Sequence, residues 1–220
     1  MRRVVIALTV AAALLAGSSR SAAVDARPQR HLIYVHGRIV QEQQSARPRH
    51  PQYGYYELEK ILDAFRVRGF VVSGGIRPKS ASTSASADQL VAQIRQLIAS
   101  GVPPDHVTVL GASMGAGITL LASARLQNPD VRFAILGACL TENVRALLAD
   151  EGKSPSGHML AIREASDDLD GPCPPWKDDP KSSPQLVATE IVLHTGLSHG
   201  FLYRPLPEWV VPVAEFARRD

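Results

Sequence analysis

Apolar and polar positions follow two repeat lengths along this chain. Short runs rich in β-branched residues stop at glycines or polar residues, and such runs are typical of buried strands. Between them, apolar residues recur three and four positions apart, which predicts amphipathic helices. The six predicted strands are His31–His36, Phe70–Val72, His106–Leu110, Val131–Leu136, Met159–Ile162 and Glu190–His194.

Helices are predicted between these strands. The first has the apolar stripe Leu58, Ile61, Leu62 and Phe65 and ends at Gly69; the second opens with a capping box at Ser86–Gln89 and continues with Leu90, Val91, Ile94, Leu97 and Ile98. The third follows Ser113 with Ile118, Leu121, Ala122 and Leu126, a short one lies around Asn143 to Ala149, and Pro207 opens the last. Loops are predicted from Arg38 to about Gln52, from Ser80 to Ser86 and from Asp170 to Pro184.

The alternation of strand and helix indicates the fold class. Strands that are apolar on both faces predict an α/β fold, with a mostly parallel sheet of about six strands and helices on both faces. The sequence shows no internal repeat and no glycine-rich phosphate loop. In sheets of this kind the working groups gather at the carboxyl ends of the strands.

The first 23 residues have the pattern of a secretory signal peptide. Arg2 and Arg3 precede an apolar run from Val4 to Ala16, and the small residues Ser21–Ala23 suit a cleavage site. The apolar run is shorter than a membrane span, which disfavours an anchor. We therefore expect a secreted or periplasmic protein in which residues 24–220 form a single domain, with no membrane span in the mature chain.

The charge balance gives no support for nucleic acid as a partner. Three of the 24 basic residues lie in the leader, which has no acidic residue, so the mature chain has 21 basic and 21 acidic residues. A balanced chain gives no composition-level argument for binding nucleic acid.

The two cysteines of the chain, Cys139 and Cys173, allow one disulfide in an oxidising compartment. The alternative is a buried Cys139 and an unpaired Cys173.

Candidate chemistry centres on Gly111-Ala-Ser113-Met-Gly115, a G-x-S-x-G sequence between a predicted strand and a predicted helix. In this context the glycines permit a strained turn that exposes the serine hydroxyl, so Ser113 is a candidate nucleophile. An ordinary strand-to-helix turn is the alternative, since glycine and serine are common in loops.

A serine hydroxyl needs a base, and His199 is the best candidate because it follows the last predicted strand in a glycine-flanked loop. A turn histidine without a catalytic role is the alternative. Asp167 and Asp168 follow the Met159–Ile162 strand, where a carboxylate can orient the imidazole. The order serine, aspartate, histidine matches the order found with nucleophile elbows.

With these motifs the mature chain resembles the α/β-hydrolase family, in its small, lidless type similar to esterases and dienelactone hydrolases. The resemblance implies that Asp167 is the acid. It also implies that His36-Gly37 is the oxyanion loop, with the backbone amides of Arg38 and Met114 as donors, and that Cys139 and Cys173 form a disulfide across the top of the sheet.

The sequence departs from this family in two ways. The two amino-terminal strands of the usual eight are missing, and the segment from Cys139 to Met159 is too short for a large lid domain. The missing strands leave the triad untouched. The short segment favours an open site and disfavours a typical interfacially activated lipase.

These features predict a serine hydrolase that cleaves an ester, thioester or amide of a small-molecule acyl substrate and needs no metal or organic cofactor. A peptidase or acyltransferase on the same scaffold, or a non-catalytic binding module with this fold, are the alternatives. An exported structural protein is a further rival, but the sequence has no repeat or heptad to favour it.

The basic loop from Arg38 to His50 directly follows the expected oxyanion loop. Its residues Arg47 and Arg49 are candidates for binding a carboxylate or phosphate on the substrate. A solvated charged loop is the alternative.

Overall fold

The structure, a computed structural model, describes residues 29–139, 142–169 and 183–219 of the chain. Its centre is a six-stranded sheet in the order β4-β1-β5-β6-β7-β8, in which every neighbouring pair is parallel. The strands are β1 (His31–Val35), β4 (Val71–Ser73), β5 (Val107–Ala112), β6 (Arg132–Leu136), β7 (Gly157–Glu164) and β8 (Leu186–Leu193). The predicted α/β class and mostly parallel sheet are therefore confirmed.

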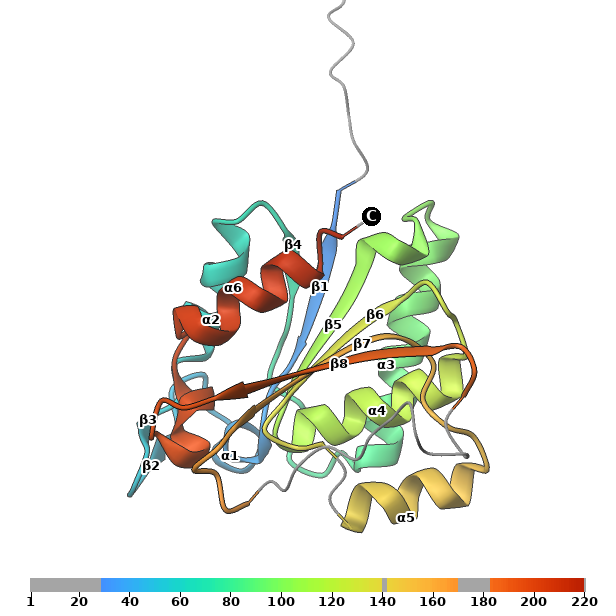
Figure 1. Cartoon of the computed structure of the whole chain (residues 1–220). Helices are drawn as coiled ribbons and strands as arrows, with labels where there is room; N and C mark the ends of the chain where they lie inside the picture. The colour runs from blue at the N-terminus through green and yellow to red at the C-terminus, as the bar shows by residue number, and fades with distance from the viewer. Residues whose placement is uncertain (1–28, 140–141, 170–182, 220) are drawn as a thin grey trace, which may run out of the picture.

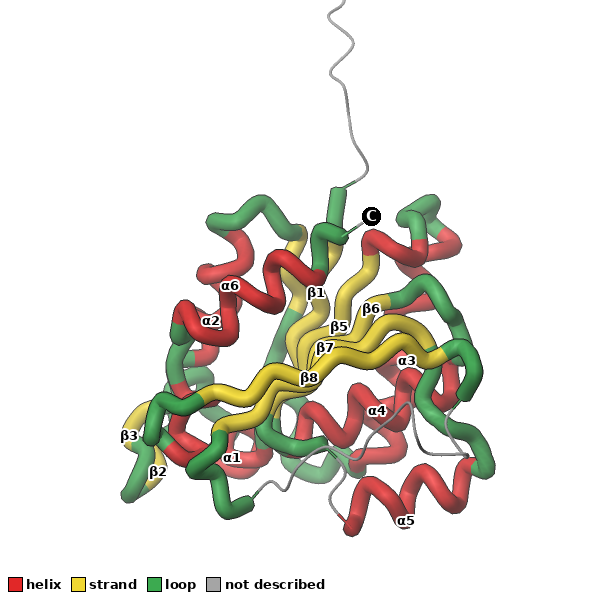
Figure 2. Tube along the Cα trace, viewed as in Figure 1, coloured by secondary structure: helices red, strands yellow, loops and turns green. Residues whose placement is uncertain are grey.

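Helices connect these strands and cover the sheet on both faces. They are α1 (Arg38–Gln43), α2 (Leu58–Arg66), α3 (Thr83–Ala99), α4 (Met114–Leu126), α5 (Glu142–Glu151) and α6 (Pro207–Phe216), with the short 3₁₀ helices η1 (Pro104–His106) and η2 (Ser198–Tyr203). In Figure 1, α2 and α6 lie on one side of the sheet, and α3, α4 and α5 lie on the other. Figure 2 shows the same three layers, with the strands between the two groups of helices.

Side chains of the central strands alternate between two hydrophobic clusters, because successive residues of a strand point to opposite faces. In β1, Leu32 and Tyr34 belong to the cluster that includes Phe65 of α2 and Trp209 of α6. Ile33 of the same strand joins the cluster on the α3 and α4 side. Burial on both faces explains why these strands read as nearly continuous apolar runs in the sequence.

Two predicted loops contain regular structure. The segment expected as a loop from Arg38 to about Gln52 folds as α1 and begins a short antiparallel hairpin of β2 (Arg49–His50) and β3 (Gly54–Tyr55). A helix of six residues is too short to establish a helical repeat in the sequence. The loop prediction was wrong here.

The start of α3 also differs from the prediction. Its N-cap is Ser82, whose side chain accepts a hydrogen bond from the Ala85 amide, so the helix begins at Thr83. The capping box expected at Ser86 lies inside the helix, where the Ser86 hydroxyl donates to the Ser82 carbonyl. Serines recur through this segment, and the local pattern does not distinguish which one caps the helix.

The expected leader, residues 1–23, lies outside the described residues, so its assignment stays a prediction. Within the described part of the chain, no helix is both long and apolar enough to cross a membrane.

Cys139 is buried and is not a free thiol. Its expected partner Cys173 lies outside the described residues, so this pairing also stays a prediction. The strands that lead toward the two cysteines, β6 and β7, are neighbours, as expected.

Helix α4 approaches β1 unusually closely at Gly115. A Cβ atom on Gly115 would lie 1.9 Å from the carbonyl oxygen of Val35 and 2.8 Å from that of His36. Both are backbone atoms that cannot move aside without shifting the strand. The same holds for Gly111 at the end of β5, where a Cβ would lie 2.3 Å from the Gly115 carbonyl oxygen.

We therefore expect Gly115→Ala to unfold the protein or to lower its free energy of unfolding by more than about 3 kcal/mol, as overpacking against rigid atoms does. Gly75→Ala is the matched control, because a Cβ there would meet nothing within 4 Å and the residue has no left-handed backbone. Urea denaturation measures the free energy of unfolding of both variants. A small and equal effect of the two substitutions would contradict the close approach.

Candidate active site

Three loops at the carboxyl ends of parallel strands of the sheet carry the residues predicted for catalysis. Ser113 follows β5, Asp167 follows β7 by three residues, and His199 lies in η2 after β8. Parallel strands deliver their carboxyl ends to the same edge of the sheet, and this edge is where the three side chains meet.

Ser113 has the strained backbone expected of a nucleophile elbow. Its φ of 53° and ψ of −119° lie in a region that residues with a side chain rarely adopt. The Ser113 amide donates to the Leu136 carbonyl on β6 at 2.8 Å, and the Ala116 amide donates to the Ser113 carbonyl at 2.8 Å. Both bonds fix the turn, so the Ser113 side chain stays partly exposed at the strand end.

A continuous chain of hydrogen bonds joins the three residues. The Nδ1–H of His199 donates to Oδ2 of Asp167 at 2.6 Å, and the Ser113 hydroxyl donates to Nε2 of His199 at 2.9 Å. Asp167 is 4% exposed and His199 is 9% exposed, so little water competes for these bonds. The arrangement sets the imidazole in the tautomer that can accept a proton from the serine.

Asp167 and Asp168 have different surroundings. Besides the bond from His199, Asp167 accepts the Leu169 amide at Oδ1 over 3.1 Å. Asp168 is exposed. Of the two aspartates left open by the strand pattern, the geometry brings Asp167 to the imidazole.

The predicted oxyanion loop lies against Ser113. A Cβ on Gly37 would be 3.4 Å from Cβ of Ser113, which shows how closely the His36-Gly37 turn approaches the elbow. Arg38 is the first residue of α1 and Met114 the first of α4. Within the described residues, the amides of Arg38 and Met114 have no hydrogen-bond acceptor, so both are available to a ligand atom.

His36 fixes the direction of one of these amides. Its Nδ1–H donates to the Gly37 carbonyl at 2.8 Å, and its Nε2 accepts the Arg77 amide at 3.0 Å. The Gly37 carbonyl and the Arg38 N–H belong to one planar peptide unit and point in opposite directions. By holding the carbonyl, His36 therefore also orients the Arg38 N–H.

This pair of bonds requires a neutral His36, because Nε2 must accept. Burial, together with the nearby positive charge of Arg77, lowers the pKa of His36 to about 4. His36 is 1% exposed. The imidazole therefore stays neutral throughout the physiological pH range.

Arg77 holds the same turn from a second side. Its Nη2 donates to the His36 carbonyl at 2.8 Å and its Nε donates to Oε1 of Gln41 in α1 at 3.1 Å. Burial lowers the pKa of Arg77 to about 10, although the phenols of Tyr56 and Tyr34 oppose this effect. Arg77 remains charged at neutral pH.

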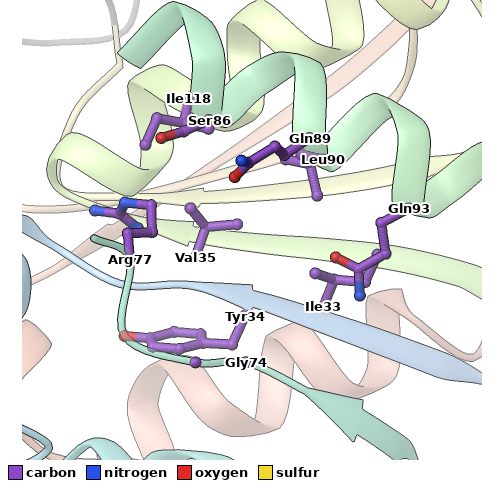
Figure 3. A pocket seen from close by; sticks show the side chains of 11 residues that line it. Ile33, Tyr34, Val35, Gly74, Arg77, Ser86, Gln89, Leu90, Gln93 and Ile118 are labelled. Atoms are coloured by element: carbon purple, nitrogen blue, oxygen red, sulfur yellow. The ribbon is translucent and has the colours of Figure 1, made fainter. Parts of the chain in front are cut away.

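Arg77 also borders a cavity of about 220 Å³ between α3 and the edge of the sheet. Figure 3 shows Gln89, Leu90 and Gln93 on α3 facing Ile33 and Val35 of β1 across this hollow. Ser113 and His199 are not among the lining residues. The cavity therefore lies beside the oxyanion turn and is separate from the serine.

Aromatic side chains lie next to His199 and the rest of η2. The rings of Tyr53 and His199 are 6.3 Å apart, and His50 stacks on Tyr53 with 4.5 Å between ring centroids. Tyr203 of η2 contacts both Tyr53 and the buried Tyr56. The β2–β3 hairpin thus packs Tyr53 next to the imidazole of His199.

The two arginines singled out in this segment behave differently. Arg47 pairs with Glu57 at 3.1 Å and its guanidinium lies 4.0 Å from the Tyr55 ring centroid. Arg49 is exposed and has no ion pair with a described residue. Arg49 is therefore the freer of the two to meet an anionic group, whereas Arg47 is engaged within the loop.

Sequence reasoning missed two residues that shape the site. Arg77 is one, and Glu164, a carboxylate only 1% exposed at the end of β7, is the other. A single acid at the end of a mostly apolar strand was the available signal for Glu164. Among the residues that the structure describes, no group of three or more metal-ligating side chains is placed to hold an ion.

Comparisons with known proteins identify the fold. No family model matches this sequence, and no curated protein matches it. Among solved structures, one from a study of LipS and LipT, two metagenome-derived lipolytic enzymes, has a TM-score of 0.58 at 12% identity, over 88% of this chain and 95% of that one. The esterase domain of a Rhodothermus marinus protein has a TM-score of 0.52 at 17% identity, over 89% of each chain.

Esterase B from Lactobacillus rhamnosis, in a structure with a tributyrin phosphonate, has a TM-score of 0.53 at 15% identity, over 87% of this chain and 75% of that one. Identities this low carry information on the fold alone. The chain has the α/β-hydrolase fold, as the resemblance of its motifs predicted.

The state of His36 gives a pH-dependent prediction. Because its pKa is about 4 in the folded protein and about 6.5 when unfolded, the unfolded chain binds the proton first as the pH falls. The free energy of unfolding should therefore fall by up to about 3 kcal/mol between pH 6.5 and pH 4 on account of this residue.

The glutamine in His36→Gln cannot be protonated, so this variant should lose the part of the pH dependence of the free energy of unfolding that comes from His36. His31 and His158 titrate in both proteins, so their contributions cancel in the difference between the two proteins. Urea denaturation at a series of pH values between 7 and 4 measures it. Parallel curves for the two proteins would show that His36 is not held neutral.

Proposed function

We propose that this protein is an exported serine hydrolase that cleaves an ester of a small acyl group through an acyl-enzyme. Ser113 is the nucleophile, His199 the general base and acid, and Asp167 the residue that orients and stabilises the imidazole. The backbone amides of Arg38 and Met114 form the oxyanion hole. The reaction uses these groups of the chain alone.

One observation carries the proposal: a single imidazole, His199, bonds Ser113 at 2.9 Å through Nε2 and Asp167 at 2.6 Å through Nδ1. A nucleophile in contact with a base that is itself oriented by a third group is the general arrangement for activating a hydroxyl. The fold alone would not support a function, because many folds carry unrelated or no activity.

Acylation follows from this geometry. The Ser113 oxygen attacks the ester carbonyl while His199 takes its proton at Nε2. The imidazolium that forms is stabilised by the buried Asp167 carboxylate, which accepts the Nδ1–H bond. His199 then gives the proton to the leaving alcohol as the carbon–oxygen bond breaks, and the acyl group remains on Ser113.

Deacylation repeats the same steps with water. His199 takes a proton from a water molecule that attacks the acyl carbonyl, and the Ser113 oxygen leaves as the proton returns to it. In both halves, negative charge develops on the carbonyl oxygen. The amides of Arg38 and Met114, which have no acceptor among the described residues, lie next to Ser113 for this charge. One such donor is typically worth a hundred- to thousandfold in rate.

The substrate class rests on two supports. The proteins with similar folds include lipolytic enzymes and esterases, which favours ester cleavage. Among its described residues, the segment between β6 and β7 holds one helix, α5, of 10 residues, which is little protein to enclose a long acyl chain. Both points favour a small acyl ester as the substrate.

Export rests on the sequence. An apolar run behind two arginines and ahead of small residues supports cleavage near residue 23 and release into the periplasm or the medium. An oxidising compartment also suits the proposed bridge between Cys139 and Cys173.

Ser113→Ala should fold normally and reduce ester hydrolysis by roughly ten-thousandfold or more, as loss of a triad nucleophile does. A fluorophosphonate probe should label the wild-type protein covalently and leave the variant unlabelled. The measurement is intact mass after labelling, together with hydrolysis of a short-chain nitrophenyl ester. Labelling of Ser113→Ala at the wild-type rate would remove Ser113 from this role.

Asp167→Asn should reduce kcat by about ten-thousandfold, because the amide favours the wrong imidazole tautomer, whereas Asp168→Asn should change kcat by less than about threefold. The two aspartates are adjacent, so each variant is the other's control. Steady-state kinetics on the same ester separate them. The reverse ranking would assign the acid to Asp168.

A further inference from the structure

Glu164 is a buried carboxylate that the proposed chemistry does not use. It is the last residue of β7, it is 1% exposed, and it pairs in register with Leu193, the last residue of β8. The two strands therefore end side by side, and the loops that carry Asp167 and His199 leave the sheet next to Glu164.

Both oxygens of Glu164 accept hydrogen bonds from the loop after β8. Oε2 accepts the Thr195 amide at 2.9 Å and the Thr195 hydroxyl at 2.8 Å, and Oε1 accepts the Gly196 amide at 3.3 Å. A carboxylate with this many donors is fixed in position, since each bond to a charged acceptor is stronger than one to a neutral acceptor.

The same carboxylate also closes its own turn. Oε1 accepts the Ser166 amide at 3.2 Å and the Ser166 hydroxyl at 2.9 Å, and the Glu164 carbonyl accepts the Asp167 amide at 3.1 Å. Ser166 extends the link, because its oxygen accepts the amide of Ser198 at 3.1 Å. Ser198 precedes His199 and has a left-handed backbone with φ of 49°.

We propose that Glu164 is a positioning residue that joins the acid loop and the base loop into one unit and so sets the contact between Asp167 and His199. The inference rests on the proposed function of those two residues. Glu164 does not touch the reacting atoms; it acts through the backbone of the residues beside them.

The charge of Glu164 is maintained by its donors. Burial by itself raises the pKa of a carboxyl group, but the bonds from Thr195 and Ser166 outweigh it and lower the pKa of Glu164 to about 2. Glu164 is therefore anionic throughout the physiological pH range. It cannot serve as a second acid, because five donors already occupy its oxygens.

Glu164→Gln is the decisive substitution. It keeps the shape of the side chain but presents an amide N–H₂ to donors that need an acceptor, so one of the two loops loses its attachment. A misplacement of about 1 Å at a catalytic group can cost about a hundredfold in rate. We expect kcat to fall by about 30-fold or more while KM changes by less than about threefold.

Ser166→Ala is a second variant that removes no charge. It deletes the hydroxyl that joins Glu164 to the Ser198 amide and should lower kcat by about three- to tenfold with KM unchanged, in a protein that folds normally. If Glu164→Gln does not fold, this variant decides the proposal. A wild-type kcat for Ser166→Ala would then overturn it.

Glu190→Gln is the matched control. Glu190 lies on β8 and pairs with Arg163 of β7 at 2.8 Å, so it joins the same two strands away from the catalytic loops. This variant should retain the kcat of the wild type. An equal loss of kcat in Glu164→Gln and Glu190→Gln would reduce Glu164 to general support of the sheet and overturn the proposal.

A spectroscopic readout separates positioning from general stability. The proton in the His199–Asp167 bond gives a low-field resonance in the proton NMR spectrum, which should shift or broaden in Glu164→Gln and stay in place in Glu190→Gln. Thermal unfolding, followed by circular dichroism, reports the folded fraction in each sample. A loss of kcat that merely follows the unfolded fraction, with the resonance unchanged, would contradict the proposal.

Fluorophosphonate labelling keeps this inference distinct from the proposed function. If the wild-type protein labels at Ser113 and Glu164→Gln labels at the same rate, the positioning role fails and the proposed function stands. If the wild-type protein is not labelled, the proposed function fails, and the resonance of the His199–Asp167 bond alone decides whether Glu164 sets their contact.

Discussion

The site depends on the strained backbone of Ser113, which has φ of 53° and ψ of −119° between β5 and α4. A side chain at this conformation is costly, and it persists only where the surrounding backbone fixes it. Here Gly111 and Gly115 allow strand, turn and helix to approach so closely that a Cβ at either position would lie within 2.3 Å of a backbone atom. The partly exposed hydroxyl therefore depends on close packing at the two glycines that lie two residues before and two residues after Ser113.

Around this turn, buried polar groups fix the orientation of neighbouring groups, which apolar packing cannot do. Hydrophobic contacts are non-directional, whereas a hydrogen bond fixes an angle as well as a distance. His36 orients the peptide between Gly37 and Arg38, Arg77 binds the His36 carbonyl, and Glu164 accepts hydrogen bonds from the loop that follows β8. The core thus places the strand ends, and a few directional bonds orient the groups on them.

The sequence predicts the strands and their parallel arrangement from local periodicity, and the chain order of the motifs predicts that Ser113 and His199 meet an aspartate that follows β7. The choice of Asp167 over Asp168 came from the family resemblance. The sequence does not predict that Glu164 is buried. A charged residue at a strand end reads as solvated until its partners are known, and those at Thr195 and Gly196 lie about 30 residues later in the chain. Such pairings depend on strand order, which periodicity does not supply.

The polar groups that orient the site differ in how they respond to acid. His36 must be neutral to accept the Arg77 amide, and its pKa is about 4, whereas Glu164 must be anionic and its pKa is about 2. As the pH falls, the imidazole of His36 is protonated first, which places an N–H against the Arg77 amide and a positive charge beside its guanidinium. The oxyanion turn is therefore the more acid-sensitive half of the site, and the link between the acid and base loops persists to lower pH.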